Sequence, residues 1–197
     1  SIQQAAAVDD LRAVPPLLNA SPGKQTVYGS EAGIDLHKLD MATFVDAEVG
    51  IALDGKIDEA VWQDIAYFDN MRVSIPDKGT PGTYATKMRM FATEKGMYIS
   101  ADMEQPRDTL VRRMSRRDDF IDRDVFGVTL DVSGTAKIGY WFFIALGDSQ
   151  SDGKVLPERR YQRDWDGPWI GKSAVTDNGW SIEMFLPWSM MSMPQTA

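Results

Sequence analysis

Apolar and polar residues alternate in short runs from Phe44 onward, and turn residues separate these runs. Such alternation places every second side chain on one face, as in a β-strand that buries one side. The residues expected to face the core are Met97, Ile99 and Ala101; Phe126, Val128 and Leu130; Trp180, Ile182, Met184 and Leu186; and Tyr84, Thr86, Met88 and Met90 from the run at 83–91. The pattern predicts several half-buried strands that share a core.

The stretch at 140–146 is apolar on both faces, which predicts a central strand or one whose second face is covered. Helix is expected only in short connections: at 58–63, where Asp58 caps the first turn, around 107–115, and at 188–191. Short strands without long helices predict an all-β fold. We expect an immunoglobulin-like or jelly-roll β-sandwich of two antiparallel sheets with short helical connections.

Residues 1–42 contain prolines and glycines and lack sustained periodicity, so they are expected to form an extended leader. Residues 43–192 are expected to form the sandwich, and 193–197 a tail. A chain of 197 residues is long enough for one sizeable domain with its own core.

Composition excludes several classes of function. The 29 acidic and 21 basic residues give a net charge of −8, which repels phosphate backbones, so nucleic acid is not an expected partner. There is no cysteine, and the single histidine, His37, lies in the predicted leader, which leaves the sandwich without a Ser-His-Asp or Cys-His system. No apolar run reaches the about 18 residues that a membrane-spanning helix needs.

Three segments, in order, resemble the family-9 carbohydrate-binding modules. Residues 53–62 (LDGKIDEAVW) are similar to the Asp-Gly-x-Leu-Asp-Glu-x-x-Trp opening of that family, and 117–131 to its acid-rich loop and following strand. Residues 178–188 (NGWSIEMFLPW) are similar to its Gly-Trp-x-x-Glu-x-x-Ile-Pro closing strand. The resemblance implies a non-catalytic sandwich that binds a glycan or oligosaccharide, often with calcium.

The segment at 164–169 (DWDGPW) looks most like large bacterial proteins in which this sandwich precedes an outer-membrane β-barrel. The resemblance implies that the chain is a fragment, with a barrel domain downstream in the full-length protein. It also implies export to the periplasm, outer membrane or cell surface of a Gram-negative bacterium.

Trp165 and Trp169 lie in a predicted loop beside Asp164, Asp166 and Arg163. Sugar rings stack on indoles, while carboxylates and guanidinium groups bond sugar hydroxyls, so we expect these residues to bind a glycan with help from Arg117. The alternative is that both indoles fill an end of the sandwich.

Asp118, Asp119, Asp122 and Asp124 supply the hard oxygen ligands that calcium prefers, and they form the expected metal site. Alternatively, these acids neutralise four neighbouring arginines. The arginines, in turn, suit an anionic glycan. They are Arg112, Arg113, Arg116 and Arg117.

Three other functions stay open from the sequence. In the first, the sandwich is a structural or docking domain beside a barrel. In the second, it binds haem through methionine and a lysine such as Lys87 or Lys137. In the third, two of its carboxylates hydrolyse a glycosidic bond. Nothing in the sequence singles out a catalytic carboxylate pair, so we expect a protein that is not an enzyme.

Overall fold

The computed structural model describes residues 41–69, 71–73, 80–133 and 137–192. The predicted tail at 193–197 and all but the last two residues of the predicted leader at 1–42 lie outside the described residues. Ala42, the last residue of that leader, belongs to the first strand and pairs with Phe91. No helix in the described ranges is long and apolar enough to cross a membrane.

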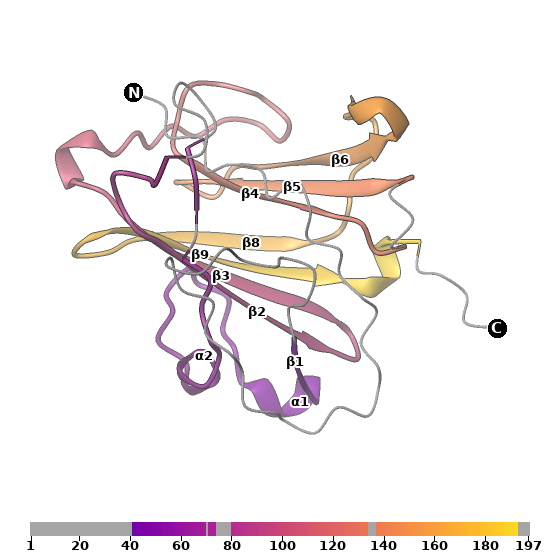
Figure 1. Ribbon diagram of the computed structural model, residues 1–197, viewed down its shortest axis with the longest axis horizontal. Helices are drawn as coiled ribbons and strands as arrows, with labels where there is room; N and C mark the ends of the chain where they lie inside the picture. The colour runs from indigo at the N-terminus through magenta and orange to yellow at the C-terminus, as the bar shows by residue number, and fades with distance from the viewer. Residues whose placement is uncertain (1–40, 70, 74–79, 134–136, 193–197) are drawn as a thin grey trace.

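Within the described ranges, nine strands form two sheets that pack face to face (Figure 1). Sheet 1 contains, in spatial order, β1 (Ala42–Phe44), β2 (Thr86–Thr93), β3 (Gly96–Glu104), β9 (Gly179–Pro187) and β8 (Ile170–Val175). Sheet 2 contains β4 (Val125–Leu130), β5 (Gly139–Ala145), β6 (Gln150–Leu156) and β7 (Arg160–Gln162). The predicted all-β sandwich is confirmed.

The pairing of β3 with β9 is the longest in the molecule as described, from Gly96 opposite Pro187 to Glu104 opposite Gly179. It places two segments that are far apart in the sequence side by side at the centre of sheet 1. The pairing of β1 with β2 is parallel, whereas the prediction was for purely antiparallel sheets. The parallel strand is three residues long and lies at the edge of the sheet.

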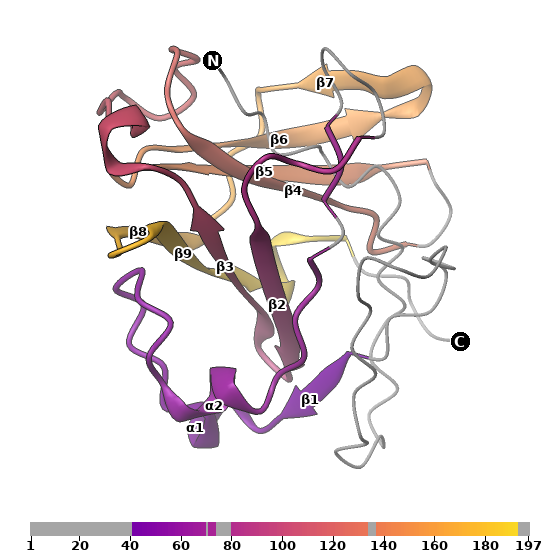
Figure 2. The same ribbon diagram turned by 60° about the vertical axis from the view of Figure 1, so that its left-hand side comes forward.

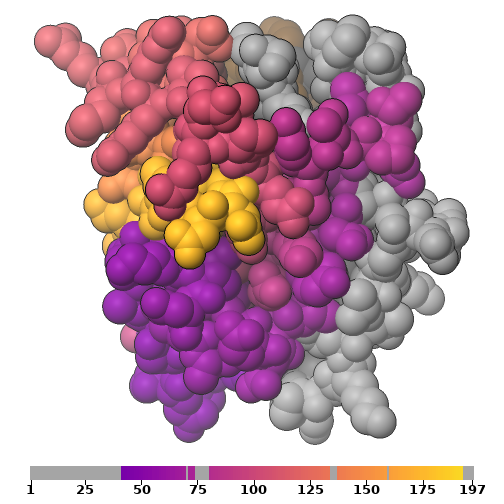
Figure 3. Space-filling model, turned by 90° about the vertical axis from the view of Figure 1, so that its left-hand side faces the viewer, coloured from indigo at the N-terminus to yellow at the C-terminus, as the bar shows by residue number. Residues whose placement is uncertain are grey.

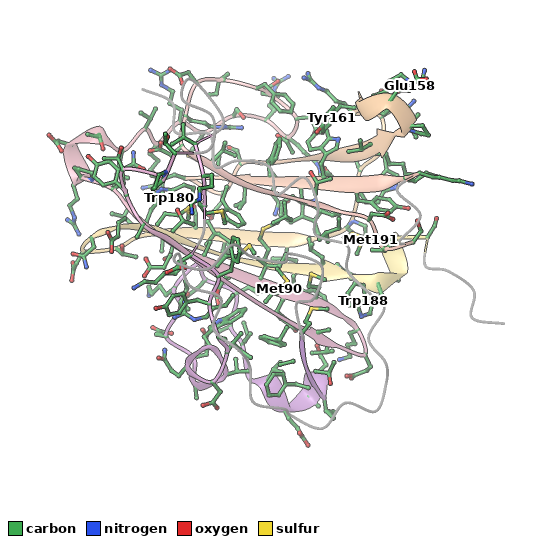
Figure 4. All side chains as sticks on the ribbon, in the orientation of Figure 1. Met90, Glu158, Tyr161, Trp180, Trp188 and Met191 are labelled. Atoms are coloured by element: carbon green, nitrogen blue, oxygen red, sulfur yellow. The ribbon has the colours of Figure 1, made fainter. Side chains whose placement is uncertain are left out.

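The main core fills the space between the sheets. The alternating residues predicted to face the core from β3, β4 and β9 are all buried there. Trp180 and Met191 lie at opposite ends of this core (Figure 4). Strand β5 has β4 and β6 as neighbours, and its Trp141, on the face away from the core, is only 2% exposed because Phe120 packs over it. The predicted central strand with a covered second face is therefore confirmed.

A second, smaller core lies on the other face of sheet 1, under α1 (Asp46–Val49) and α2 (Ala60–Gln63), as Figures 1 and 2 show. Phe91 and Tyr98 from the sheet stack with ring centroids 5.0 Å apart, and Trp62 of α2 packs against Phe91. Sheet 1 is thus buried on both faces, which explains why β2 and β3 carry large side chains in consecutive positions.

Glu183 of β9 ties the segment before α2 to this face. Its carboxyl group is completely buried and accepts hydrogen bonds from Trp62 Nε1 (2.9 Å) and from the backbone N–H groups of Asp54 and Gly55 (3.0 Å each). Ser181 Oγ donates to Gly55 O at 2.6 Å. The first and third segments of the family resemblance, 53–62 and 178–188, therefore meet on this face of sheet 1. The hydrogen bonds between them attach the segment before α2 to the sheet.

The helical connections are shorter than predicted. α2 lies inside the range predicted at 58–63, but Asp58 does not cap it, because Glu59 occupies the N-cap position and no side chain bonds there. The range predicted at 107–115 contains only the 3₁₀ turn η1 (Arg107–Thr109), and the predicted turn after β9 is η3 (Trp188–Met190). A further turn, η2 (Pro157–Arg159), joins β6 to β7.

Candidate functional site

An open cleft of about 440 Å³ lies at one end of the sandwich, where β3 ends and β8 turns into β9. Figure 3 faces this end and shows the yellow atoms of the β8–β9 region between the indigo atoms of the early chain and the pink atoms that follow β3. The cleft volume is in the range of small-molecule binding sites. Its lining residues are Tyr84, Glu104, Gln105, Pro106, Arg107, Asp177 and Asn178.

Backbone hydrogen bonds hold the three segments of the cleft together. Gln105 N donates to Asn178 O at 2.9 Å, which joins the end of β3 to the β8–β9 turn. Glu104 N donates to Ala85 O, also at 2.9 Å, which fixes the segment that carries Tyr84. A Cβ atom at Gly179 would lie 2.0 Å from Met103 O, so this close approach of the strands requires glycine. The fold therefore sets the spacing of the cleft walls.

The polar side chains of the cleft are also held. Arg107 Nη2 donates to Thr176 O at 3.2 Å and lies 3.4 Å from Asp177 Oδ1. Both side chains are exposed, so this ion pair contributes little stability and can exchange its partner for a ligand. Gln105 Nε2 donates to Thr109 O and to Asp124 Oδ2, which fixes the direction of the amide.

The chemistry of the cleft combines one aromatic ring with several hydrogen-bonding groups. Tyr84 is 38% exposed and presents its ring to solvent. Glu104 and Asp177 offer acceptors, Arg107 offers donors, and Asn178 offers both. An apolar ring face beside such groups suits a ligand with an apolar face and many hydroxyls.

The two tryptophans predicted to stack on a sugar do not form an open pair. Trp169 is 4% exposed and packs edge-on against Phe142 in the main core, with ring centroids 5.6 Å apart. The prediction of an open stacking face at Trp169 is therefore wrong, because the indole fills the sandwich. Trp165 is half-buried against Tyr140, at 4.9 Å between ring centroids, with Lys154 Nζ 5.8 Å from its ring.

The charged residues predicted to accompany these tryptophans go to different places. Arg163 lies over the ring of Phe120, 4.0 Å from its centroid, and Asp164 is exposed. Arg117 donates to Asp152 Oδ1 through Nε (3.0 Å) and Nη2 (2.7 Å) and lies 3.4 Å from Asp166 Oδ1. The structure thus brings Arg117 and Asp166 together, but around a buried carboxylate and outside the open cleft.

The four acids predicted to hold calcium do not converge. Asp119 and Asp122 are exposed, and Asp124 Oδ2 accepts hydrogen bonds from Val111 N and Gln105 Nε2. Asp118 instead joins two other acids, and within the described residues this is the single group of three acids whose oxygens lie within 4.8 Å of one another. The other two members are Asp152 and Asp166.

Arg117 forms ion pairs with two of these three acids, Asp152 and Asp166. Both oxygens of Asp152 already accept hydrogen bonds, Oδ1 from Arg117 and Oδ2 from Gly167 N at 2.6 Å. Burial raises the pKa of Asp118, and its Oδ1 accepts a hydrogen bond from Asp152 N. The four predicted calcium ligands therefore do not converge on one site, and the three acids that do come together share Arg117 as a counter-charge.

The lysines proposed for haem are not arranged as axial ligands. Lys87 lies over the ring of Tyr67, 5.4 Å from its centroid, on the face of β2 opposite to the core-facing Met88. Lys137 is exposed. The haem hypothesis has no support from the arrangement of these residues.

Comparison with solved structures places this architecture among known folds. The chain is similar to a carbohydrate-binding module of family 9 from Caldicellulosiruptor kristjanssonii in complex with cellotriose, with a TM-score of 0.54, 12% identity, and coverage of 78% of this chain and 68% of that one. The sandwich has a family-9-like fold. The same module in complex with glucose gives a TM-score of 0.50 and 13% identity over 78% and 69% of the two chains. No protein-family model matches the sequence of this family-9-like sandwich, and no curated protein matches it.

The cleft residues of the family-9-like sandwich escaped the sequence analysis. The alternating pattern predicts Tyr84 on a core-facing strand, whereas β2 begins at Thr86 and leaves Tyr84 in the preceding loop. Asn178 enters the sequence prediction only as the first residue of the closing motif. A usable signal was the Asp177-Asn178-Gly179 turn itself, because a polar turn between paired strands lies at the rim of a sandwich.

Proposed function

We propose that the family-9-like sandwich binds a carbohydrate in the cleft at Tyr84, Glu104–Arg107 and Asp177–Asn178, and that it catalyses no reaction. The observation that carries this proposal is the cleft itself, in which an exposed aromatic ring lies beside carboxylate, amide and guanidinium groups. The similar modules were solved with cellotriose and with glucose, which supports a sugar as the ligand class.

In the proposed complex, the ring of Tyr84 packs against the apolar face of a sugar ring. Glu104 and Asp177 accept hydrogen bonds from hydroxyls, while Arg107 and Asn178 donate them. Backbone hydrogen bonds already fix the segments that carry these groups, so binding orders side chains without ordering the backbone.

The proposal of a binding function without catalysis rests on the exposure of the cleft acids. Glycoside hydrolysis needs a general acid in a desolvated site and a second carboxylate at a fixed distance. The Asp177 side chain is fully exposed and contacts Arg107, and Glu104 is exposed as well. Neither acid lies in the dry environment that hydrolysis requires.

Calorimetric titration with cellotriose and related oligosaccharides tests the proposal. We expect binding that the Tyr84→Ala variant weakens at least about tenfold, since ring stacking is worth on the order of 1 kcal/mol beyond the area that it buries. The matched control is Tyr161→Ala, because Tyr161 is 52% exposed and belongs to β7, the edge strand of sheet 2, apart from Trp180, which follows the β8–β9 turn (Figure 4). Absence of binding to any tested sugar at millimolar concentration, or equal affinity of Tyr84→Ala and wild type, would overturn the proposal.

Three predictions from the sequence accompany this proposal. They are export from a Gram-negative bacterium, a barrel domain downstream of the sandwich, and calcium as a bound ion. Melting the protein in calcium and in a chelator tests the last of these, and a bound ion would raise the melting temperature with calcium concentration.

A further inference from the structure

The loop that follows the cleft, residues 110–124, contains no helix or strand, yet two buried charged side chains fix it. Arg123 is 8% exposed and donates to Arg113 O (3.1 Å), Asp119 O (3.0 Å) and Ser115 Oγ (2.7 Å). Asp124 is 9% exposed and accepts hydrogen bonds from the loop and from the cleft residue Gln105. We call residues 110–124 the arginine loop.

One part of the arginine loop, residues 112–117, carries positive charge. It contains four arginines and no acid, whereas the exposed acids Asp119 and Asp122 lie in the second half of the loop. Arg117 turns inward to Asp152, whereas Arg112, Arg113 and Arg116 are exposed and form no ion pair with any described residue. A loop whose backbone is held from inside and that carries unpaired guanidinium groups outside is suited to bind anions, because only the arginine side chains lose conformational entropy on binding.

The arginine loop and the cleft form one continuous surface. Arg107 lines the cleft and belongs to η1, which leads directly into the loop. Gln105 lines the cleft and bonds Asp124, which anchors the loop from its other end. In Figure 3 the pink atoms that follow β3 lie directly above the yellow β8–β9 region. A polymer with one sugar in the cleft can therefore extend onto the segment that carries the unpaired arginines.

We propose that the ligand is an acidic polysaccharide, whose carboxylate or sulfate groups are bound by Arg112, Arg113 and Arg116 while one of its sugars occupies the cleft. This inference rests on the proposed carbohydrate-binding function and names the charge class of its ligand. Forked guanidinium groups match the geometry of planar carboxylates and of sulfates. The net charge of −8 opposes the long-range attraction of any polyanion, so in this proposal the arginines act at short range, on a polymer that the cleft holds.

The test compares polygalacturonate with the same polymer after full methyl esterification, which removes the charge and keeps the sugars. We expect the wild-type chain to bind the acidic polymer about tenfold more tightly at low ionic strength, with a preference that falls as salt is added. The triple variant Arg112→Gln, Arg113→Gln, Arg116→Gln is expected to lose this preference and to bind the esterified polymer as the wild type does. All three positions are exposed, and circular dichroism checks that the variant is folded.

Each other outcome has a defined meaning. Equal wild-type affinity for the two polymers, or a preference that survives in the triple variant, overturns the inference and leaves the cleft proposal standing. Equal binding of both polymers by Tyr84→Ala and wild type overturns the cleft proposal instead. Vesicles of anionic and neutral phospholipid provide the last arm: arginine-dependent binding to anionic vesicles, without a preference between the polymers, overturns the inference in favour of a lipid surface.

Discussion

Two buried carboxyl groups determine much of the electrostatics at the scale of single residues. Asp152 has its charge balanced by Arg117 at 2.7 Å. Glu183 has no such partner, and it is held by three N–H donors from Trp62, Asp54 and Gly55. Burial outweighs these donors and, with the nearby charge of Glu59, raises the pKa of Glu183 to about 7. The two acids therefore predict different responses to substitution and to pH.

Removing the guanidinium group of Arg117 leaves Asp152 buried without a counter-charge. We expect Arg117→Gln to lower the free energy of unfolding by about 3 kcal/mol. Urea unfolding at neutral pH measures the loss. The neighbouring variant Arg116→Gln is the control, since an exposed arginine without a partner should change stability by less than about 0.5 kcal/mol. Similar losses in the two variants would contradict this account.

Glu183 makes stability depend on pH. The folded protein keeps the Glu183 proton up to about pH 7, whereas the unfolded chain releases it near the ordinary value of 4.5. The stabilising contribution is therefore fully present below pH 4.5 and is lost as the pH rises to about 7. We expect the free energy of unfolding to fall across this window, by on the order of 2 kcal/mol, and the slope to be absent in Glu183→Gln.

Unfolding midpoints in urea at several pH values between 4.5 and 7.5 test this pH dependence. Glu183→Gln is also expected to be less stable throughout, because the amide places its own N–H₂ against an N–H donor. Glu48→Gln, in the exposed part of α1, should keep the wild-type slope. A slope that persists in Glu183→Gln would assign the effect to another group.

At the scale of elements, the segment before α2 depends on one close contact with β8. Gly55 has φ +89, and a Cβ atom there would lie 2.5 Å from the carbonyl carbon of Ser173. We expect Gly55→Ala to lower the free energy of unfolding by more than about 2 kcal/mol, because backbone strain and a clash with backbone atoms add. Gly50→Ala separates the two causes, since Gly50 has φ +61 and nothing within 4 Å of an added Cβ atom.

Denaturant unfolding of the two glycine variants gives the comparison directly. Gly50→Ala should lose only the about 1 kcal/mol that a left-handed backbone costs a residue with a side chain. If both variants lose the same amount, backbone conformation alone accounts for the effect, and the contact with Ser173 is unimportant.

The strands were predictable from sequence because alternation is a local signal that packing does not change. Tyr84 shows where this signal fails. The alternating pattern begins at Tyr84, two residues before β2 starts at Thr86. The short helices were harder to predict. The sequence predicts Asp58 as the N-cap of a helix, but α2 begins at Ala60 and has Glu59 at its N-cap position. The alternation of apolar residues indicates which side chains are buried, and it does not indicate where the hydrogen-bonded pairing of a strand ends.

At the scale of the whole molecule, the candidate site was not predictable, because its parts come from three distant segments. The pairing of β3 with β9 brings Glu104 next to Gly179, and no local pattern specifies that pairing. Trp165 and Trp169 lie in a segment without periodicity, so sequence could not tell which indole enters the core. Asp152, which completes the group of Asp118 and Asp166, comes from strand β6, whereas the other two acids lie in loops.

The two cores share sheet 1, so the molecule is expected to unfold as one unit. Strands β2, β3 and β9 contribute side chains to both cores, to the main core from one face of the sheet and to the smaller core from the other. We expect Trp62→Phe, which removes the hydrogen bond to Glu183, to lower the unfolding midpoint of the entire chain. Far-ultraviolet and near-ultraviolet circular dichroism should show one coincident transition. Two separate transitions would show that the segment under sheet 1 unfolds on its own.

The contact between Trp62 and Glu183 has an optical consequence. Trp62 is one of six tryptophans, and its indole Nε1 lies 2.9 Å from a carboxyl oxygen whose charge changes near pH 7. A negative charge at that end of an indole shifts its fluorescence emission, so the emission of this tryptophan changes when Glu183 loses its proton. Trp62 is thus an intrinsic fluorescent probe at the point where the segment before α2 is attached to the sheet.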